Sequence, residues 1–319
     1  MSRVAVDRRR VVLGLGAGAL SACAGPASQV ADVQKEDPRG GIGGTGIVGV
    51  LTEFGSLIVN GLKIEIDDRT RVDTVLGRGD LDDLALGQAL TVEADTEAGG
   101  LFARRVLIAD PLVGRLEAVS GDGRRLRVNG VEARLDPGVA SAAKPGDRVA
   151  VSGLWRGAAV AASRVALAAT GPDAISGAVT RRGDAVLVGG RALTLAEEIA
   201  PPPIGSFAVV RGTAESEGIA VETLSVGRFV GATAPLARLS VEGYLDRIPT
   251  APFYAVSGLG HSFDTAARLA SFAGARTIFS GAYTGAFAVE TGLILPEGAG
   301  ARRRLLTAGV PAAQTRPAR

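Results

Sequence analysis

The chain has 319 residues, of which 46% are hydrophobic but only 4% aromatic, and it contains 45 glycines and 15 prolines. So few large aromatic side chains argue against one large core and favour several thin cores joined by tight turns. Residues 1–22 contain four Arg and one Asp, so the rest of the chain has 31 basic and 32 acidic side chains despite a sequence pI near 9.0. This near-neutral balance argues against a nucleic-acid partner, which would need a basic groove.

Residues 1–22 have the three-part pattern of a bacterial signal peptide. A basic stretch ends in Arg9 and Arg10, an apolar run covers residues 11–22, and a short tetrapeptide ends at a cysteine. Twelve apolar residues are too few to span a bilayer, which needs about twenty. The segment therefore predicts export rather than a transmembrane helix. The tetrapeptide consists of Leu20, Ser21, Ala22 and Cys23.

This tetrapeptide resembles the lipobox of bacterial lipoproteins, in which the cysteine thiol is alkylated with diacylglycerol and becomes the new N-terminus. Cys23 is the only cysteine of the chain, so no second thiol is present to form a disulfide with it. Arg9 and Arg10 resemble a twin-arginine signal, and both this route and the general secretory route stay open. Ala24, where an Asp would resemble a retention signal for the inner membrane, favours the outer membrane. We expect a periplasm-facing protein with a lipidated cysteine and a flexible stalk over residues 23–40.

From residue 41 onward one pattern recurs four times, at a spacing of about 65 residues. Each copy has an opening strand with a glycine, a hairpin, and two further strands, the first of which begins with glycine. The hairpin turns contain Asn-Gly or Gly-Gly, which tolerate the positive φ angles of a type I′ turn. These turn residues are Asn60 and Gly61, Asn129 and Gly130, and Gly189 and Gly190; the fourth copy has Ser257-Gly258.

Five alternating strands per copy predict an all-β chain of tandem small antiparallel β-barrels of the oligonucleotide/oligosaccharide-binding type. Closure of each barrel would remove the exposed sheet edges. A β-propeller is the alternative, but its blades are shorter than these copies. Short helical turns are expected at 81–84 and 266–269, and in the fourth copy residues 265–275 and 281–285 also fit an irregular cap. The predicted units are 41–110, 111–171, 172–232 and 233–299, followed by a basic disordered tail at 300–319.

The segment from Gly40 to Gly49, together with 54–56 and 59–61, resembles the start of proteins that contain domain of unknown function 5666. The resemblance is specific over about residues 40–110, weaker over 111–170, and fades afterwards, where Gly189-Gly190 and Ser257-Gly258 replace Asn-Gly. It implies a bacterial, exported or lipid-anchored protein made of repeated small β-barrels. The resemblance supplies no catalytic residues.

Three patterns suggest a cofactor or metal, but each has a simpler interpretation. Residues 41–46 spell G-x-G-x-x-G, yet a polar stalk precedes them and a strand follows, whereas a dinucleotide site needs a strand before and a helix after. His261 is the only histidine, so it has no second His or free Cys with which to hold zinc. Asp80, Asp82 and Asp83 resemble the opening of a calcium loop, but the next residues lack the expected ligand and Gly, which favours a helix start. We expect no cofactor and no metal.

Four features favour a non-catalytic envelope protein that binds another envelope protein or a glycan, or spaces a partner from the membrane. They are the predicted tether, the flexible stalk, the repeats, and the shortage of acid–base and nucleophilic residues in plausible constellations. Stacking on such a ligand could involve Trp155, Tyr244, Phe253 and Tyr254, although burial in the barrels is the competing role for these side chains. The alternative function is a cell-wall or polysaccharide hydrolase that uses paired carboxylates. The candidate pairs are Asp67 with Asp68 and Glu197 with Glu198, but adjacent residues on a strand point to opposite faces.

Overall fold

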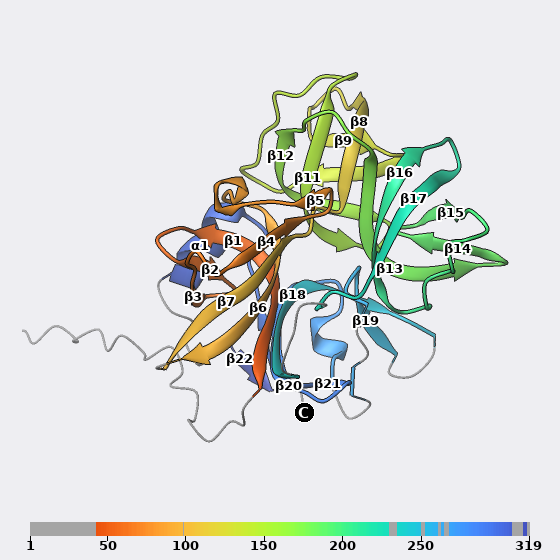
Figure 1. Cartoon of the computed structure of the whole chain (residues 1–319). Coiled ribbons are helices and arrows are strands. Elements are labelled where there is room, and N and C mark those ends of the chain that lie inside the picture. The colour runs from red at the N-terminus through yellow and green to blue at the C-terminus, as the bar shows by residue number, and fades with distance from the viewer. Residues whose placement is uncertain are drawn as a thin grey trace, which may run out of the picture. The chain divides into compact units, whose positions relative to one another are not determined.

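The computed structural model describes residues 43–97, 99–229, 235–249, 253–260, 263–264, 268–307 and 315–317. The predicted signal peptide, Cys23 with its lipobox, the stalk and His261 lie outside the described residues. Strands dominate the described part, as the all-β prediction requires (Figure 1). In these residues no helix has the length and apolar character needed to cross a membrane.

The first five-stranded ring, ring 1, closes on itself. β1 pairs antiparallel with β2 and β6, β2 pairs with β3, β6 pairs with β7, and β3 lies parallel to β7. A short hairpin of β4 and β5 continues along β7, and a 3-10 turn, η1, precedes β6. The bounds are β1 Gly44–Glu53, β2 Leu57–Val59, β3 Leu62–Glu65, β4 Arg71–Thr74, β5 Gly77–Arg78, η1 Leu81–Asp83, β6 Ala89–Glu97 and β7 Gly100–Ile108.

Two further rings repeat this order. Ring 2 consists of β8 Leu112–Val119, β9 Arg125–Val128, β10 Val131–Leu135, β11 Arg148–Arg156 and β12 Ala159–Leu167. Ring 3 consists of β13 Asp173–Arg182, β14 Ala185–Val188, β15 Arg191–Thr194, β16 Phe207–Ala214 and β17 Gly218–Val226. Their first strands pair with the fourth, and their third strands pair with the fifth, as in ring 1.

The prediction of small tandem barrels is confirmed, but the barrels are not wholly antiparallel. In each ring the third and fifth strands are parallel. An odd number of strands cannot alternate in direction all the way round a closed ring, so one neighbouring pair must be parallel. The resulting order, 1-2-3-5-4-1, is the order of an oligonucleotide/oligosaccharide-binding barrel.

Unit 4 keeps the order of the rings but closes less completely. β18 (Leu236–Arg247) pairs with β19 (Tyr254–Val256) and β20 (Arg276–Tyr283), and β20 pairs with β21 (Phe287–Ile294). The third strand is reduced, among the described residues, to a parallel bridge between Phe263 and Phe287. Phe263 stacks on Phe287 with ring centroids 5.8 Å apart, so aromatic bulk fills this end of the unit. A 3-10 turn, η2 (Ala270–Phe272), lies before β20, and the first two residues of the helical turn expected at 266–269 lie outside the described residues.

The expectation of a disordered tail over residues 300–319 is wrong for residues 300–307, which belong to a helix that begins at residue 299. This helix is α1 (Ala299–Thr307), and residues 315–317 form strand β22 (Thr315–Pro317) beside β21. Leu306 packs in a buried cluster with Ile278, Leu293 and Leu295, and the Arg302 side chain is buried as well. The arginines of the tail predict solvent exposure, but Arg302 has a carboxylate and a carbonyl partner inside the protein.

Recurring glycines mark where each ring is sealed. A glycine two residues before the fourth strand has a positive φ in every copy, which favours glycine over residues with a Cβ. Its N–H donates to a carbonyl of the first strand, at distances between 2.8 and 3.1 Å. The four pairs are Gly87 with Leu51, Gly146 with Leu116, Gly205 with Val179, and Gly274 with Leu245.

A bulge in each fourth strand was not foreseen. The register between the fourth and fifth strands shifts at Glu93/Ala94, Ser152/Gly153, Arg211/Gly212 and Ser280/Gly281. Such bulges increase twist and bend a strand, which helps a small sheet to close. In three copies a glycine stands at the bulge, where a Cβ would lie about 2 Å from a carbonyl oxygen of the fifth strand. The glycine that recurs at this position in three copies is therefore a feature of the sequence from which the bulge could have been predicted.

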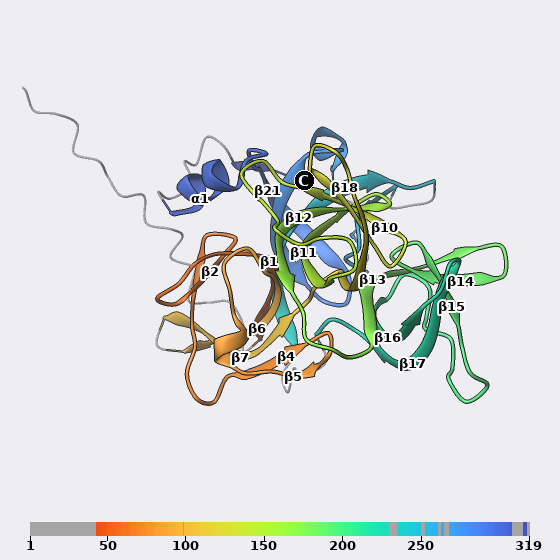
Figure 2. The same ribbon diagram turned by 90° about the horizontal axis from the view of Figure 1, so that it is seen from above.

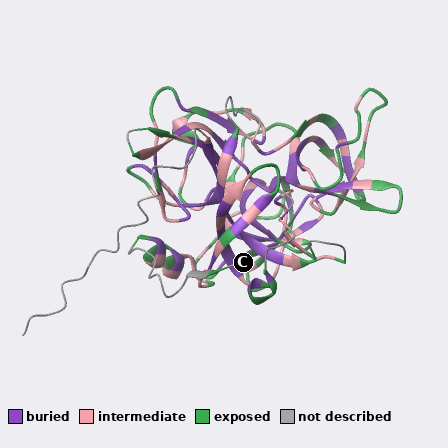
Figure 3. Cartoon of the chain, turned by 90° about the horizontal axis from the view of Figure 1, so that it is seen from below, coloured by how far each residue is buried: buried purple, intermediate pink, exposed green. Residues whose placement is uncertain are grey.

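The rings pack in pairs through their opening strands. Figure 2 shows β14 to β17 of ring 3 gathered on one side of the molecule and β2, β6 and β7 of ring 1 on the other. β1 of ring 1 runs parallel to β18 of unit 4, whereas β8 of ring 2 runs antiparallel to β13 of ring 3. Rings 2 and 3 share one hydrophobic cluster that includes Trp155, and ring 1 has its own. Buried residues follow the strands and exposed residues gather in the loops (Figure 3).

Candidate functional site

The predicted hairpin turns have the backbone that type I′ turns require. The φ angles are 57° and 78° at Asn60 and Gly61, and 51° and 71° at Asn129 and Gly130. At Gly189 and Gly190 they are 55° and 79°. Asparagine tolerates positive φ angles better than most other residues with a Cβ, so Asn-Gly and Gly-Gly can both form the type I′ turn.

The two turn asparagines also connect neighbouring units, a role that sequence reasoning missed. Asn60 Nδ2 donates to the carbonyl of Val48 in β1 at 3.0 Å and to that of Ser240 in β18 at 3.2 Å. Asn129 Nδ2 does the same between Val113 in β8, at 3.0 Å, and Ala174 in β13, at 3.2 Å. Each side chain thus joins the opening strands of two units. We call these two residues the turn asparagines.

The opening-strand glycine makes room for each turn asparagine. A Cβ at Gly49 would lie 2.0 Å from Asn60 Oδ1, and a Cβ at Gly114 would lie 1.9 Å from Asn129 Oδ1. Real Cβ atoms do not approach an oxygen so closely, so the pairing of glycine with asparagine is a steric requirement. The recurrence of Gly49 and Gly114 was visible in the sequence, but its cause was not.

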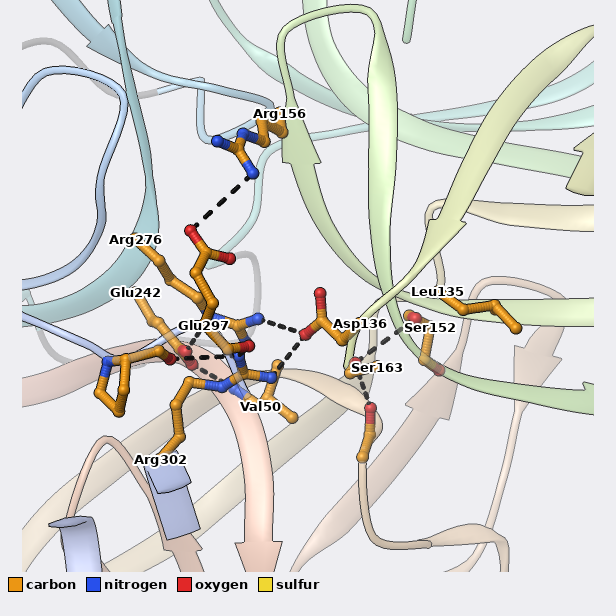
Figure 4. A network of polar contacts seen from close by, with 12 residues as sticks. Val50, Leu135, Asp136, Ser152, Arg156, Ser163, Glu242, Arg276, Glu297 and Arg302 are labelled. Carbon is orange, nitrogen blue, oxygen red and sulfur yellow. Dashed lines mark hydrogen bonds and ion pairs between the residues drawn. The ribbon is translucent and has the colours of Figure 1, made fainter. Parts of the chain in front are cut away.

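A buried network of four charged side chains lies where ring 1, ring 2, unit 4 and α1 meet (Figure 4). Arg276 Nε donates to Glu242 Oε1 at 2.7 Å, and Arg276 Nη1 donates to Asp136 Oδ2 at 2.7 Å. Arg302 Nη2 donates to the same Asp136 oxygen at 2.5 Å. The second oxygen of Glu242 accepts from the backbone N–H of Val50 in β1, at 2.9 Å. We call Arg276, Asp136, Glu242 and Arg302 the ion network.

The ion network is balanced, with two arginines and two carboxylates. The Arg276 side chain has no exposed surface, and its carboxylate partners are at most 4% exposed. Burial opposes the charge of Arg276, but Glu242 and Asp136 outweigh it and raise the pKa of Arg276 above its ordinary value. Because charges this deeply buried must stay in contact, the network fixes the relative positions of the elements that supply them.

A surface groove of about 210 Å³ lies on ring 1, at the end of β3 and the start of β7. Its polar lining has four carboxylates and two arginines, with Phe102 beside them. Arg69 pairs with Asp67 at 2.7 Å, and Arg104 pairs with Asp95 at 2.6 Å. The surplus of carboxylates favours a ligand with positive charge or with several hydrogen-bond donors. The carboxylates are those of Glu65, Asp67, Asp95 and Glu97.

The paired carboxylates considered for hydrolysis are all exposed, and of the first pair Asp67 lines the groove of ring 1 whereas Asp68 does not. Asp67 accepts hydrogen bonds from the side chain and backbone of Arg69, which lower the pKa of Asp67. A general acid needs a raised pKa, so this environment is unsuited to proton donation at neutral pH. Glu197 and Glu198 lie side by side in an exposed turn after β15.

A raised carboxyl pKa occurs elsewhere, at Asp110 in the segment between rings 1 and 2. Burial raises the pKa of Asp110 to about 6, and the Ser152 hydroxyl and Arg164 act in the opposite direction. Ser152 Oγ donates to Asp110 Oδ1, and Ser176 Oγ donates to the Asp110 carbonyl at 3.0 Å. This carboxyl lies in the core rather than in the groove, so it bears on stability.

The aromatic candidates for ligand stacking separate into two groups. Trp155 and Tyr244 are buried at 6% and 1% exposure, and Trp155 Nε1 donates to the Ser176 carbonyl at 2.8 Å. These two side chains belong to the core and cannot stack on an external ligand. Phe253 is 54% exposed and has a φ of 65°, while Tyr254 is half-buried.

The patterns that resembled cofactor and metal motifs have structural roles where they are described. Gly44 and Gly46 lie in β1, so the glycine-rich motif enters a strand. Asp80 caps η1: its side chain accepts from the Asp82 N–H, while Asp83 accepts from the Asp80 N–H. In the described part of the chain, no group of three or more His, Cys, Asp or Glu residues is placed to hold a metal.

Comparison with known proteins gives one match. Residues 45–106 match the model of a domain of unknown function, DUF5666. The match covers ring 1, from β1 into β7, and includes the groove and the first turn asparagine. No curated protein and no solved structure matches the chain. The domain resemblance is thus confirmed for ring 1.

Proposed function

We propose that this protein is a lipid-anchored cell-envelope protein that binds or positions an envelope partner without catalysing a reaction. The lipobox at residues 20–23 supports the anchor, and the stalk that follows supports display away from a membrane. Ring 2, ring 3 and unit 4 are divergent copies of the DUF5666 ring, which is supported by their shared strand order and glycine seal.

The ion network is the main observation that supports a role in positioning a partner. Arg276 bonds to residues 34 and 140 positions away along the chain, and Arg302 to one 166 positions away. Separate barrels on flexible linkers would have no need to bury charges between them, because the cost of desolvation is large. A body whose units are held in register presents a defined surface, which suits binding and spacing.

The groove of ring 1 is the proposed contact surface for the partner. Its surplus of carboxylates favours a protein segment that carries Lys or Arg, and Phe102 in the lining offers an apolar contact. An amino sugar of a glycan offers the same charge, and it is the second partner to test. Either ligand would be held at the ring that matches DUF5666.

The anchor is tested by Cys23→Ser, with Ser21→Ala as a control that keeps the cysteine. The wild type and the control should incorporate labelled fatty acid and fractionate with membranes, whereas Cys23→Ser should do neither. A wild-type protein that is soluble and carries no acyl group would refute the anchor. Replacing Arg9 and Arg10 with Lys should block export if the twin-arginine route is used, and should leave it intact if the general secretory route is used.

The contact surface is tested by placing a photo-crosslinking amino acid at position 102, in the groove, and at position 167 as a control. Leu167 is 73% exposed at the end of β12, in ring 2. One stoichiometric partner should crosslink from position 102 only, and Glu65→Lys with Glu97→Lys should abolish this product. Equal crosslinking from both positions would contradict the groove. Turnover of a glycan by the purified protein, lost in a folded carboxylate variant, would overturn the non-catalytic role.

A further inference from the structure

Arg228 is a buried arginine that holds three parts of the molecule together. It follows β17 of ring 3 and is 7% exposed. Its Nη1 donates to Thr91 Oγ1 in β6 of ring 1 at 2.9 Å, and its Nη2 donates to the Gly258 carbonyl of unit 4, also at 2.9 Å. The guanidinium lies 3.8 Å from the centre of the Phe207 ring.

All of these partners are neutral. Among the residues that the structure describes, Arg228 makes no ion pair, whereas the buried arginines 276 and 302 both contact carboxylates. Burial alone lowers the pKa of Arg228 to about 9, so the side chain keeps its positive charge at neutral pH. A buried charge without a counterion is costly, and proteins seldom keep one.

A cavity of about 30 Å³ lies beside this guanidinium. Trp155, Ser176, Phe207 and Ser257 contribute to its walls. A cavity holds a water molecule once it offers roughly 10 to 15 Å³, so this one has room for a species slightly larger than water. Glu242 also contributes to the lining, but Arg276 and the Val50 N–H engage its two oxygens.

Arg228 also has hydrogen-bonding capacity to spare. A guanidinium has five N–H groups, and three of them are used by Thr91, Gly258 and Leu259. The remaining two belong to the terminal nitrogens, one on each. A fork of this kind suits an anion.

We propose that the cavity beside Arg228 binds a small monovalent anion of the size of chloride. The anion neutralises the buried guanidinium at the place where ring 1, ring 3 and unit 4 meet, and so stabilises their packing. Water would fit the cavity but would leave the charge uncompensated.

The test compares thermal unfolding of the detergent-solubilised full chain in chloride and in gluconate, at equal ionic strength. Between 1 and 300 mM chloride the wild-type Tm should rise by roughly 4 °C more than in gluconate. Arg228→Met should lose this difference, because no buried charge is left to neutralise. Arg191→Met is the matched control: Arg191 also donates to backbone carbonyls, of Glu215 and Gly218, but lies nearer the surface. This variant should keep the wild-type response to chloride.

Crystals grown in bromide give a readout that does not depend on a variant. An anomalous peak within contact distance of Arg228 Nη1 and Nη2 would support the proposal, and it would do so even if Arg228→Met failed to fold. A water molecule in the cavity with no bromide peak would overturn it. A Tm that responds equally to chloride and gluconate would also overturn it, as would an unchanged chloride response in Arg228→Met.

Discussion

The units form two pairs: ring 1 packs with unit 4, and ring 2 packs with ring 3. In both pairs an asparagine side chain joins the opening strands, but the number of paired strand positions differs. β1 and β18 pair over five positions, from Gly44 with Leu236 to Val48 with Val241. β8 and β13 pair over two. Asn60 bridges the first pair of strands and Asn129 the second. The asparagine contact therefore does not depend on strand direction, and it forms a larger share of the junction where the backbone pairing is short.

The two pairs also differ in what fills the space next to the strands. Rings 2 and 3 share a continuous apolar cluster, in which Trp155 fills the space that Gly177 and Gly189 leave. Ring 1 and unit 4 instead meet beside the ion network, where Glu242 of β18 accepts from Val50 of β1. Apolar packing tolerates small shifts, whereas buried ions need fixed geometry. The packing of ring 1 against unit 4 is thus sensitive to the loss of one charged side chain of the ion network, a sensitivity that the apolar cluster of rings 2 and 3 does not share.

The largest effect is expected for Arg276→Met, which leaves Glu242 and Asp136 without this partner in a buried site. Losing one member of a buried ion pair typically lowers the free energy of unfolding by about 3 to 5 kcal/mol. Arg69→Met, which removes an exposed ion pair with Asp67, is the control and should unfold like the wild type. Adding Glu242→Gln to Arg276→Met should recover part of the loss in urea unfolding. Equal stability of Arg276→Met and the control would show that the network contributes nothing.

Gly49→Ala should rank next, because its Cβ would collide with Asn60 Oδ1. Overpacking of this kind costs about 1 to 3 kcal/mol. Asn60→Gly removes the obstructing side chain and keeps the positive φ, so the double variant should be more stable than the sum of the single effects predicts. The double-mutant cycle is measured by chemical denaturation. Strictly additive effects would mean that the glycine does not serve the asparagine.

The same substitution at the two turn asparagines tests the comparison directly. Asn60→Gly and Asn129→Gly each lose two buried hydrogen bonds to backbone carbonyls, worth about 1 to 2 kcal/mol in all. Hydrogen exchange should rise more at β13 in Asn129→Gly than at β18 in Asn60→Gly, because β13 has fewer strand pairs to hold it. A larger rise in hydrogen exchange at β18 would show instead that the junction of ring 1 with unit 4 depends more on its turn asparagine.

Asp110→Asn, the smallest structural change, should alter how the stability of the folded protein depends on pH. The pKa of Asp110 is raised in the folded protein, from 3.8 to about 6, so the folded state binds a proton more tightly than the unfolded state. The wild type therefore loses stability as the pH rises from 4 to 7, by on the order of 3 kcal/mol from this group. Asp110→Asn lacks this loss, so its stability relative to wild type should grow over that interval. A difference that stays constant with pH would contradict the assignment.

The sequence by itself determined the local features of this protein. Alternating apolar residues set the strands, and Asn60-Gly61 and its counterparts set the hairpins, because these depend on neighbours in the chain. The recurring glycines gave the order of elements in each copy, and the DUF5666 match bears out the resemblance for ring 1. The lipid anchor at Cys23 rests on a similarly local motif, and it stays a prediction.

Only the tertiary structure decided which groups meet. The residues next to Arg276, Arg302 and Arg228 in the sequence do not distinguish them from the exposed arginines, because the burial of an arginine depends on partners far along the chain. Arg276 and Arg302 have carboxylate partners far along the chain, and Arg228 has none among the described residues. The parallel third and fifth strands follow from the closure of a five-membered ring. The pairing of rings depends on faces that form only once the barrels exist, and that is why the turn asparagines and the ion network could not be read beforehand.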